Sequence, residues 1–421
     1  MTPRDFIPYR ITFVSPKLKR LHRLFSYLNE CGQEAEVLLR GQTAEDTEGE
    51  LVLVLEPHSG GKSPLSLRMG GGSEALSQLV NGIPGSSASF LEPDSLFYTC
   101  RKPLSSRLPF DYQRVPAVIR IFFRNHLFRR ASRGIARFEE YKKWYLATFF
   151  DLKALLMLDT ETFGAADGVG GLYPEGREFA FLMTHDVDSE YGQKKIQGLL
   201  DIEENSGLRS CSFFVPASYQ LNHRLLESMI SKGHEIGCHD VRHDTKIAFT
   251  SESNIRREFE GIRGFVRAFD VKGFRAAGFL RTQSLMTVVS ETFKYDSSIP
   301  EKRIMPYLNG CFRQHPFNMF NGLLEIPMTL PSDGELLSLG FSVDEIFEIW
   351  RSKIQILSLI NGCAVFLNHP EIGFSDGKEM TALYEKFLGT VIADFKPWIC
   401  LPRELSDWRQ GRMEKCKVRI S

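Results

Sequence analysis

After residue 176 the chain alternates short apolar runs with longer amphipathic segments. Segments such as NHRLLESMISKGH (222–234) and SVDEIFEIWRSKIQILSLING (342–362) repeat apolar residues at the helical period. The runs that read as buried strands are FAFLMTHD, SCSFFVP, GHEIGCHD, KGFRAAG, LEIPMT, CAVFLNHP and PWICLP. Strands that alternate with helices of this length predict βαβ units and a parallel sheet. About seven such units suffice to close a (β/α) barrel.

The pattern before residue 164 is mixed. Residues 10–15 and 50–57 predict strands, residues 17–32 predict an amphipathic helix, and residues 115–150 predict mostly helix. The glycine- and serine-rich stretch 58–74 predicts a loop. Turn residues dominate 164–176, which makes it the best boundary. The predicted parts are therefore an N-terminal α/β accessory region (1–163), a linker (164–176), the barrel (177–410) and a C-terminal tail (411–421).

Composition narrows the class of protein. Lysine plus arginine and aspartate plus glutamate number 52 each, so no net charge attracts nucleic acid. There is no uncharged apolar run long enough for a transmembrane helix, and the N-terminus lacks the apolar core of a secretory signal. The 8 cysteines are scattered without a C-x-x-C pair, which favours free thiols in a reducing compartment. We therefore expect a cytoplasmic protein.

Polar side chains gather where two predicted strands end. The first apolar run ends in His185, Asp186 and Asp188, and two carboxylates so close together are costly unless a cation or a shared proton relieves their repulsion. His239 and His243 follow another run, and their spacing lets two imidazoles meet one metal from a helical turn or a tight loop. The alternative is a pair of surface histidines on a loop. Together with the aspartates, the histidines predict a His-His-Asp metal site with open positions.

Two more strand ends carry groups suited to catalysis. Arg275 follows a strand, where a guanidinium can hold a carboxylate ionised and oriented. The small residues after it, through Gly278, let backbone N–H groups approach a substrate oxygen. His369 ends another apolar run. Alone, the arginine could form a structural salt bridge and the histidine could simply end a strand. Their joint placement with the other clusters favours an active site.

Taken in order, these stretches resemble the motifs of the polysaccharide deacetylase family, the NodB-homology carbohydrate esterases. THDVD resembles the first motif, in the variant form with one residue between the aspartates. HDVRH, GFRAAGF, LEIPMTLPSD and LNHP resemble the second to fifth motifs, and WICLPRELSDWR resembles the final strand and closing helix. The resemblance covers about residues 176–410, implies a distorted (β/α) barrel of the NodB type, and says little about residues 1–160.

The resemblance implies a role for each motif residue. These are Asp186 as general base, Asp188, His239 and His243 as metal ligands, Arg275 as the group that orients the base, Gly278 as the backbone oxyanion donor and His369 as general acid. Val187 stands directly after Asp186, so we assign the ligand role to Asp188, which lies on the same side of an extended chain. The reverse assignment of the two aspartates stays open. Ala277 stands where the third motif usually has proline, and a looser loop there could change the substrate.

The implied activity is hydrolysis of an N-acyl group, most simply N-acetyl, from a sugar. In that reaction a metal-bound water attacks the amide, Asp186 accepts its proton and His369 protonates the leaving amine. One divalent ion is implied, zinc first, with cobalt, nickel or manganese as alternatives. A cytoplasmic location points to a nucleotide-linked or lipid-linked glycan precursor. Two alternatives remain: a non-sugar C–N hydrolase or deformylase of the same superfamily, and an inactive carbohydrate-binding relative.

The segment 114–138 carries seven arginines and no acidic residue. Val115, Val118, Ile119, Phe122 and Phe123 recur in it at helical spacing. One interpretation is a helix that packs its apolar face on the barrel and leaves its arginines in solvent. The other is an interfacial helix on an anionic membrane, which would place the protein at the inner face of that membrane.

Overall fold

The computed structural model describes residues 9–13, 51–57, 65–69, 100–107, 115–132, 137–146, 173–302, 308, 310, 311, 313–319, 321–359 and 361–420. They fall into two compact units. The first three strands belong to one unit, and the described residues from Cys100 onward belong to the other. The linker at 164–176 stays a prediction.

The first unit contains a small antiparallel sheet. Its strands, in the order β1-β2-β3, are β1 (Tyr9–Phe13), β2 (Leu51–Pro57) and β3 (Leu65–Met69). The strands predicted near residues 10–15 and 50–57 are confirmed. The loop predicted over 58–74 is wrong in part, because residues 65–69 form β3 and pair with β2. The sequence LSLRM alternates apolar and polar residues as a strand does, but the glycines around it obscure that period. The helix predicted at 17–32 lies outside the described residues.

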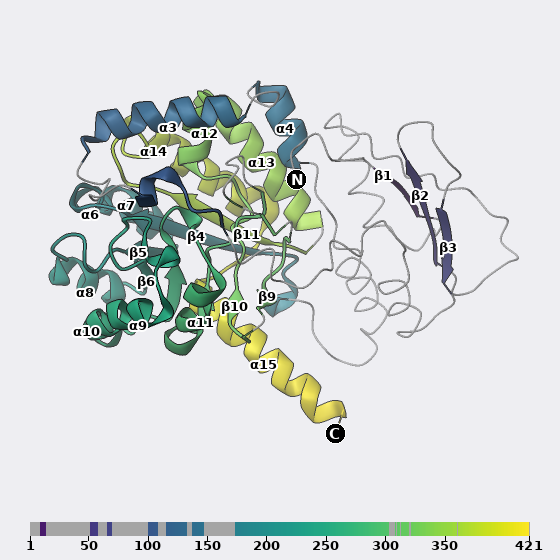
Figure 1. Cartoon of the computed structure of the whole chain (residues 1–421). Helices are drawn as coiled ribbons and strands as arrows, with labels where there is room; N and C mark the ends of the chain where they lie inside the picture. Colours follow the sequence, from purple (N-terminus) through teal and green to yellow (C-terminus); the bar gives the residue numbers. More distant parts are fainter. Residues whose placement is uncertain are drawn as a thin grey trace, which may run out of the picture. The chain divides into compact units, whose positions relative to one another are not determined.

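The second unit is built on a curled sheet that is parallel except at one end (Figure 1). Its strands are β4 (Ala180–Val187), β5 (Cys211–Phe214), β6 (Glu235–His239), β7 (Gly273–Arg275), β8 (Tyr295–Asp296), β9 (Phe317–Asn318), β10 (Leu324–Glu325), β11 (Cys363–Asn368) and β12 (Trp398–Ile399). The order is β11-β4-β5-β6-β7-β8-β10-β9, with β12 paired to the start of β4 and β9 antiparallel to β10. Beyond β10, the Leu330 amide donates to the Val365 carbonyl at 3.3 Å and links this end to β11. The predicted distorted (β/α) barrel is confirmed.

Helices connect the strands and cover the sheet. They are α3 (Ala117–Ala131), α4 (Phe138–Leu146), α6 (Glu190–Lys195), α7 (Gln197–Asn205), α8 (His223–Ser231), α9 (Glu252–Gly261), α10 (Arg263–Ala268), α11 (Gln283–Thr292), α12 (Asp333–Leu339), α13 (Val343–Leu359), α14 (Lys378–Thr390) and α15 (Pro402–Ile420). Short turns lie at η3 (Leu104–Arg107), η6 (Pro174–Gly176), η7 (Ile247–Phe249), η8 (Ala277–Phe279) and η9 (Val391–Phe395). Polar residues such as Asn222, Ser251 and Ser332 cap the helices that follow them by accepting a backbone N–H, as expected at these ends.

An aromatic cluster joins the sheet to α13 and α14. Trp350 of α13 meets Phe366 of β11 edge-on, with ring centroids 4.7 Å apart. Tyr384 and Phe387 of α14 pack on the same Phe366 ring. All four side chains are fully buried. Because each aromatic side chain buries about 150–250 Å², this cluster makes a large contribution to fixing β11, the strand that leads into His369.

Two helices that precede the barrel in sequence pack on it. The Tyr141 hydroxyl of α4 donates to Glu335 of α12 at 2.6 Å, and the Tyr145 hydroxyl donates to the Thr329 carbonyl at 3.0 Å. Figure 1 shows α3 lying beside α12.

Among the described residues, no helix combines the length and the apolar character that crossing a membrane requires. The cysteines at positions 100, 211, 238, 311, 363 and 400 are buried free thiols.

Candidate metal centre and active site

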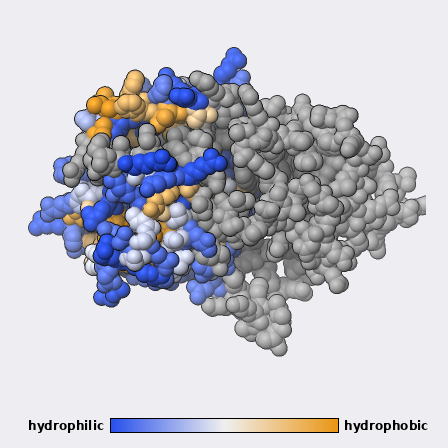
Figure 2. Space-filling view, in the orientation of Figure 1, coloured by the Kyte–Doolittle hydropathy of each residue, from blue (hydrophilic) through white to orange (hydrophobic). Residues whose placement is uncertain are grey.

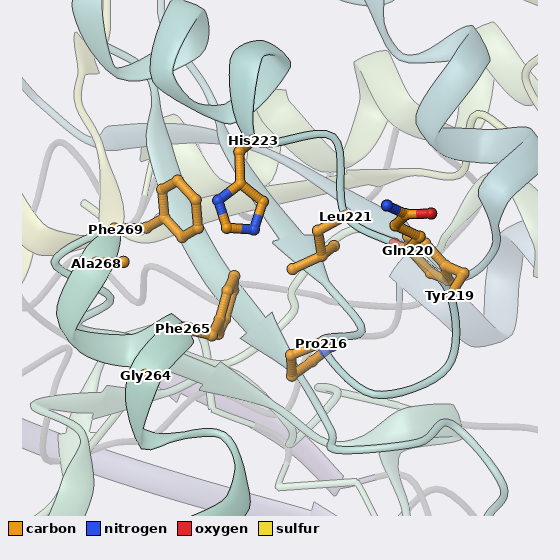
Figure 3. A pocket seen from close by; sticks show the side chains of 9 residues that line it. All are labelled: Pro216, Tyr219, Gln220, Leu221, His223, Gly264, Phe265, Ala268 and Phe269. Carbon is orange, nitrogen blue, oxygen red and sulfur yellow. The ribbon is translucent and has the colours of Figure 1, made fainter.

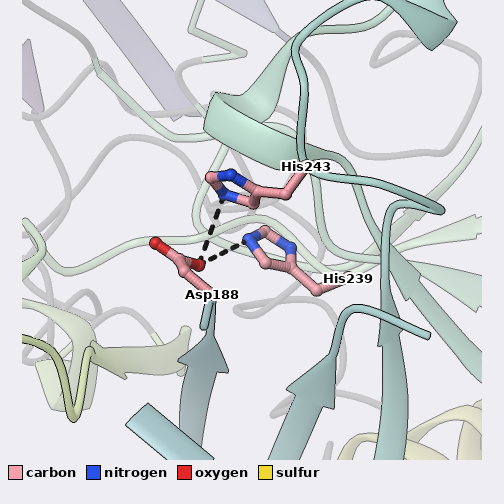
Figure 4. Close-up of side chains that lie close together, drawn as sticks. All are labelled: Asp188, His239 and His243. Atoms are coloured by element: carbon pink, nitrogen blue, oxygen red, sulfur yellow. Dashed lines mark ion pairs between the residues drawn. The ribbon is translucent and has the colours of Figure 1, made fainter. Parts of the chain in front are cut away.

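Asp188, His239 and His243 converge beyond the carboxyl ends of β4 and β6 (Figure 4). Asp188 Oδ1 lies 3.2 Å from His239 Nε2 and 3.3 Å from His243 Nε2. One ligand atom from each residue lies within 4.8 Å of the other two. Both imidazoles are buried, and the Asp188 side chain is 19% exposed. The three predicted ligands therefore surround one small space that opens toward solvent.

A tight loop, not a helical turn, brings the two histidines together. β6 ends at His239, and the chain then turns through residues with left-handed backbone angles, namely Asp240 (φ 62°), His243 (φ 54°) and Thr245 (φ 62°). Such angles are uncommon outside glycine and are often found at functional sites. The turn returns His243 to His239, so that their ring centroids lie 4.8 Å apart.

The donor atoms fit a divalent cation. His239 Nδ1 lies 3.0 Å from the Arg275 carbonyl and donates to it, which leaves Nε2 as the lone-pair nitrogen facing Asp188. Within the described part of the chain, Asp188 Oδ1 is buried and accepts no hydrogen bond. A buried carboxylate oxygen without a donor is costly, and a cation among two imidazoles and this oxygen would satisfy it. Two nitrogens and one oxygen are a ligand set that suits zinc.

The charges of this cluster depend on one another. Burial alone would raise the pKa of Asp188, but His243 and His239 hold that pKa well below its ordinary value. Burial alone would lower the pKa of His243, and Asp188, Asp240 and Asp186 raise it to about 9. Asp188 and His243 therefore favour each other's charged forms.

Asp186 lies beside this cluster with a different partner. Its Oδ1 accepts a hydrogen bond from Arg275 Nη1 at 2.8 Å, and its Oδ2 lies 3.7 Å from His239 Nε2 and 3.9 Å from His369 Nε2. Burial would raise the pKa of Asp186, but Arg275, His239 and His369 lower it below its ordinary value. Asp186 is therefore held as a carboxylate, with one oxygen occupied by Arg275 and the other directed between two histidines.

Arg275 is fully buried at the end of β7 and holds Asp186 through a fixed set of bonds. Its Nη1 also donates to Thr184 Oγ1 at 3.0 Å, and its Nε and Nη2 donate to the carbonyl and hydroxyl of Ser297 at 3.0 and 2.9 Å. The Phe213 ring packs on the guanidinium, with 4.3 Å from the Arg275 Cζ to the ring centroid. Thr184 and Ser297 could not be predicted from the sequence, because a buried hydroxyl on or directly after a strand has no distinctive pattern.

His369 completes the site from the end of β11. Its Nδ1 donates to Asp333 Oδ1 at 2.6 Å, while its Nε2 faces Asp186. Burial alone would lower the pKa of His369, but the charge and hydrogen bond of Asp333, aided by Asp188 and Asp186, raise it to about 9. Asp333 is the first residue of α12 and the last residue of LEIPMTLPSD, the stretch that resembles the fourth motif. An aspartate that orients a histidine could have been sought there.

Two other acidic and basic neighbours have structural partners. His185 points away from Asp186 and Asp188, to the opposite side of β4, where its Nε2 bonds to Glu203 of α7 at 2.7 Å. Glu371 follows His369 and accepts hydrogen bonds from the Ser189 amide and hydroxyl at 3.0 and 2.5 Å. Burial and the charge of Asp188 raise the pKa of Glu371 to about 7. Glu371 therefore supports the loop that carries Asp188.

Gly278 lies in the η8 turn that follows β7. Its φ of 57° is left-handed, a conformation that glycine adopts without strain, and the residue is exposed. The structure thus places it in a tight turn next to Arg275 in sequence, and its role as oxyanion donor stays a prediction.

A hollow of about 350 Å³ lies between the β5–α8 loop and α10 (Figure 3). Its lining includes Phe265, Phe269 and His223, together with Tyr219. The Tyr219 hydroxyl donates to the carbonyl of Val187 at 2.6 Å, and Val187 stands between Asp186 and Asp188 in the sequence. The hollow therefore adjoins the strand that carries the acidic residues, although none of the clustered ligands lines it.

Comparisons with known proteins find similarity in solved structures alone. No protein-family model matches the sequence, and no curated protein matches it. A Mycobacterium smegmatis protein assigned as a polysaccharide deacetylase shares 21% identity over 57% of this chain and 93% of its own, with a TM-score of 0.46. The PuuE allantoinase shares 16% identity over 56% and 91%, with a TM-score of 0.47.

A third solved structure is a pseudoenzyme of the CE4 family from Bacillus anthracis. It shares 14% identity over 56% of this chain and 66% of its own, with a TM-score of 0.38. Identities this low do not transfer an activity, so the chemistry has to be argued from the site. The solved structures to which the chain is similar include proteins described as polysaccharide deacetylases, the family whose order of motifs the sequence resembles.

Proposed function

We propose that the protein is a metal-dependent hydrolase that removes an N-acyl group, most simply N-acetyl, from a sugar. The observation that carries the proposal is the arrangement of three groups around one space. These are a His-His-Asp cluster, a carboxylate fixed by Arg275, and a histidine fixed by Asp333. A metal ligand set between a base and an acid is what metal-assisted amide hydrolysis needs.

In this proposal Asp188, His239 and His243 hold the divalent ion. When bound there, the ion would supply Lewis acidity to the amide carbonyl and make a water more acidic. Zinc suits the ligand set best, and cobalt, nickel or manganese could replace it.

The other residues of the site move and hold protons. Asp186 accepts the proton of the attacking water on Oδ2, because Arg275 occupies Oδ1. His369 donates from Nε2 to the leaving nitrogen, because Asp333 fixes the proton on Nδ1. The backbone N–H of Gly278 would stabilise the oxyanion. The products are a free amine and a carboxylate.

We propose a nucleotide-linked or lipid-linked glycan precursor as substrate, which places the protein in glycan biosynthesis, in the cytoplasm or at the inner face of its membrane. Arg124 supports an anionic substrate. Its guanidinium lies 4.0 Å over the Phe374 ring, and Phe374 in turn packs on His369 with 4.8 Å between ring centroids. Burial lowers the pKa of Arg124 to about 10, so it stays charged near the site at neutral pH.

The test is mass spectrometry of N-acetylated nucleotide sugars and lipid-linked sugars after incubation with zinc-loaded protein. We expect loss of one acetyl group from at least one sugar and no loss with the His239→Ala, His243→Ala double variant. That variant should also lose its zinc by elemental analysis, because a divalent ion is held poorly by one protein ligand. Full zinc content in the double variant would show that the metal site is misplaced. Cleavage confined to non-sugar amides would favour a different C–N hydrolase. Binding of sugars without turnover by the zinc-loaded protein would favour an inactive relative.

A further inference from the structure

Helix α3 exposes bulky apolar side chains on its outer face. Val118 is 75% exposed, Phe122 68% and Phe123 59%, and Ile119 and Leu127 are also exposed. Orange atoms gather over this helix in Figure 2. The interpretation in which the apolar face packs on the barrel is therefore wrong: the helix is turned the other way.

The inner face of α3 explains this orientation. Arg124 stacks on Phe374, as described above, and Ile121 packs so close to Gly373 that a side chain on that glycine would meet the Ile121 Cδ1 at 2.9 Å. The stem of an arginine and the face of its guanidinium can cover apolar surface as well as an aliphatic side chain does. These contacts attach α3 to the loop that follows His369, and they leave its phenylalanines outside.

The outer face has the size and charge of a docking surface. If each phenylalanine side chain carries about 200 Å², the exposed parts of Phe122 and Phe123 alone come to about 250 Å². With the three aliphatic residues the patch comes to about 500 Å², toward the upper end of the range of about 300–600 Å² for the largest apolar patch of a monomer, and such patches are often functional. Arg129 and Arg130 are exposed in the last turn of the helix, and no acidic residue occurs between residues 114 and 138.

We propose that the outer face of α3 docks on an anionic lipid bilayer. Phenylalanines beside arginines, with no acidic residue among them, match the boundary between acyl chains and negatively charged head groups. A protein partner would also need acidic groups facing Arg129 and Arg130. Between two copies of this chain, the arginines would find no acidic partner on the same helix face, because residues 114–138 contain none. Charge complementarity therefore favours the lipid surface.

Docking through α3 would also place the active site at the membrane. The same helix touches the loop behind His369, so its outer face and the site lie on opposite sides of one helix. This step rests on the proposed deacetylase activity. It selects, among the proposed substrates, a glycan linked through phosphate to a membrane lipid.

Vesicle sedimentation with the full-length protein tests the docking. We expect it to sediment with phosphatidylcholine vesicles that contain phosphatidylglycerol, but not with phosphatidylcholine alone, and to be released at high salt. Each basic residue near an anionic surface strengthens binding about 5-fold, so Arg129→Gln with Arg130→Gln should weaken it about 25-fold. Phe122→Ser with Phe123→Ser should weaken it at least about 10-fold at any salt concentration.

Matched controls use exposed residues elsewhere on the same unit. Arg224→Gln with Arg257→Gln removes two exposed arginines from α8 and α9, and Ile230→Ser with Ile392→Ser removes two exposed apolar side chains. Both control variants should bind vesicles as the unaltered protein does. Equal binding of the α3 variants, or no binding to anionic vesicles at low salt, would overturn the proposal. Concentration-dependent dimers that the Phe122 and Phe123 substitutions abolish would overturn it in favour of a second copy.

An activity measurement separates this inference from the function it rests on. Zinc-loaded protein that binds vesicles but cleaves no acetylated sugar would leave the docking standing and the deacetylase proposal refuted. Protein that cleaves a detergent-dispersed lipid-linked sugar and a vesicle-embedded one equally fast would refute the role of docking in substrate delivery. We expect the Phe122 and Phe123 substitutions to slow only the vesicle-embedded reaction.

Discussion

Replacing Asp333 with asparagine removes one negative charge beside His369 and changes almost no volume. Both oxygens of Asp333 are fully used. Oδ1 accepts from His369 Nδ1 at 2.6 Å and from the Gly334 amide at 2.7 Å, and Oδ2 accepts from the His369 amide at 2.9 Å and from Ser375 Oγ at 2.7 Å. An asparagine offers one oxygen and one NH2 group. In either orientation of this side-chain amide, its NH2 group faces a backbone N–H that Asp333 had accepted, and that N–H loses its acceptor.

The size of the effect follows from these contacts. A hydrogen bond to a charged group contributes about 1.5–3 kcal/mol, and one pKa unit corresponds to about 1.4 kcal/mol. We therefore expect Asp333→Asn to lower the pKa of His369 from about 9 by about 1–2 units. A general acid acts in its protonated form, so the high-pH limb of kcat/KM should move down by the same amount. The backbone N–H that loses its acceptor should lower the free energy of unfolding by about 1–3 kcal/mol.

The assay is the pH profile of kcat/KM for the acetylated sugar, with thermal unfolding measured in parallel. At neutral pH we expect kcat to fall by only about 2-fold, because a His369 pKa of about 7–8 still leaves half or more of the imidazole protonated. Ser375→Ala is the matched control, because it removes one donor to Asp333 and keeps the charge. It should lower stability and leave the high-pH limb in place. An Asp333→Asn variant that is less stable but has an unmoved limb would show that Asp333 is only structural.

Two further predictions concern Asp186 and its neighbours. The Asp186→Asn variant should keep its zinc and lower kcat by at least about 10²-fold, whereas the Asp188→Asn variant should lose zinc affinity first. Elemental analysis together with kinetics distinguishes the two variants, and the reverse pattern would exchange the roles of the two aspartates. Arg275→Met leaves Asp186 buried without its cation, so the free energy of unfolding should fall by about 3–5 kcal/mol. Arg275→Lys should recover only part of that lost stability, since an ammonium cannot reach Asp186, Thr184 and Ser297 together. Equal unfolding midpoints for Met and Lys would refute this account of Arg275.

The parts of the fold that could be predicted are those with a clear period. β4, β5, β6 and β11 are buried runs bounded by turns, and each appears where the pattern placed it. β8 was missed because it spans only Tyr295 and Asp296, too short for any period to show. α12 was missed for a related reason, since its seven residues are nearly all buried and no polar face marks a helix.

The orientation of α3 could not be predicted because amphipathicity says which faces differ, not which one is covered. Its apolar face was assigned to the barrel on the general tendency of apolar residues to be buried. In the structure Arg124 and Ile121 cover the loop behind His369, and Phe122 is left outside. Which face of α3 is covered depends on the residues that this loop presents to it, a phenylalanine ring and a glycine. The loop lies about 250 residues away in the sequence, so the pattern within the helix does not reveal it.

The asymmetry between Asp186 and Asp188 is the strongest argument for their proposed roles. Two carboxylates two residues apart on one strand face are both held ionised, but by different partners. Asp186 is held by the guanidinium of Arg275, a cation that cannot leave the site. The partners of Asp188 near the site are two imidazoles, whose Nε2 atoms would themselves be ligands. If the roles were exchanged, Arg275 would repel the metal from the carboxylate meant to hold it. A site that only bound sugar would need neither Arg275 nor the buried Asp333 that is hydrogen-bonded to His369. Arg275 keeps Asp186 deprotonated, and Asp333 keeps the proton on His369 Nδ1.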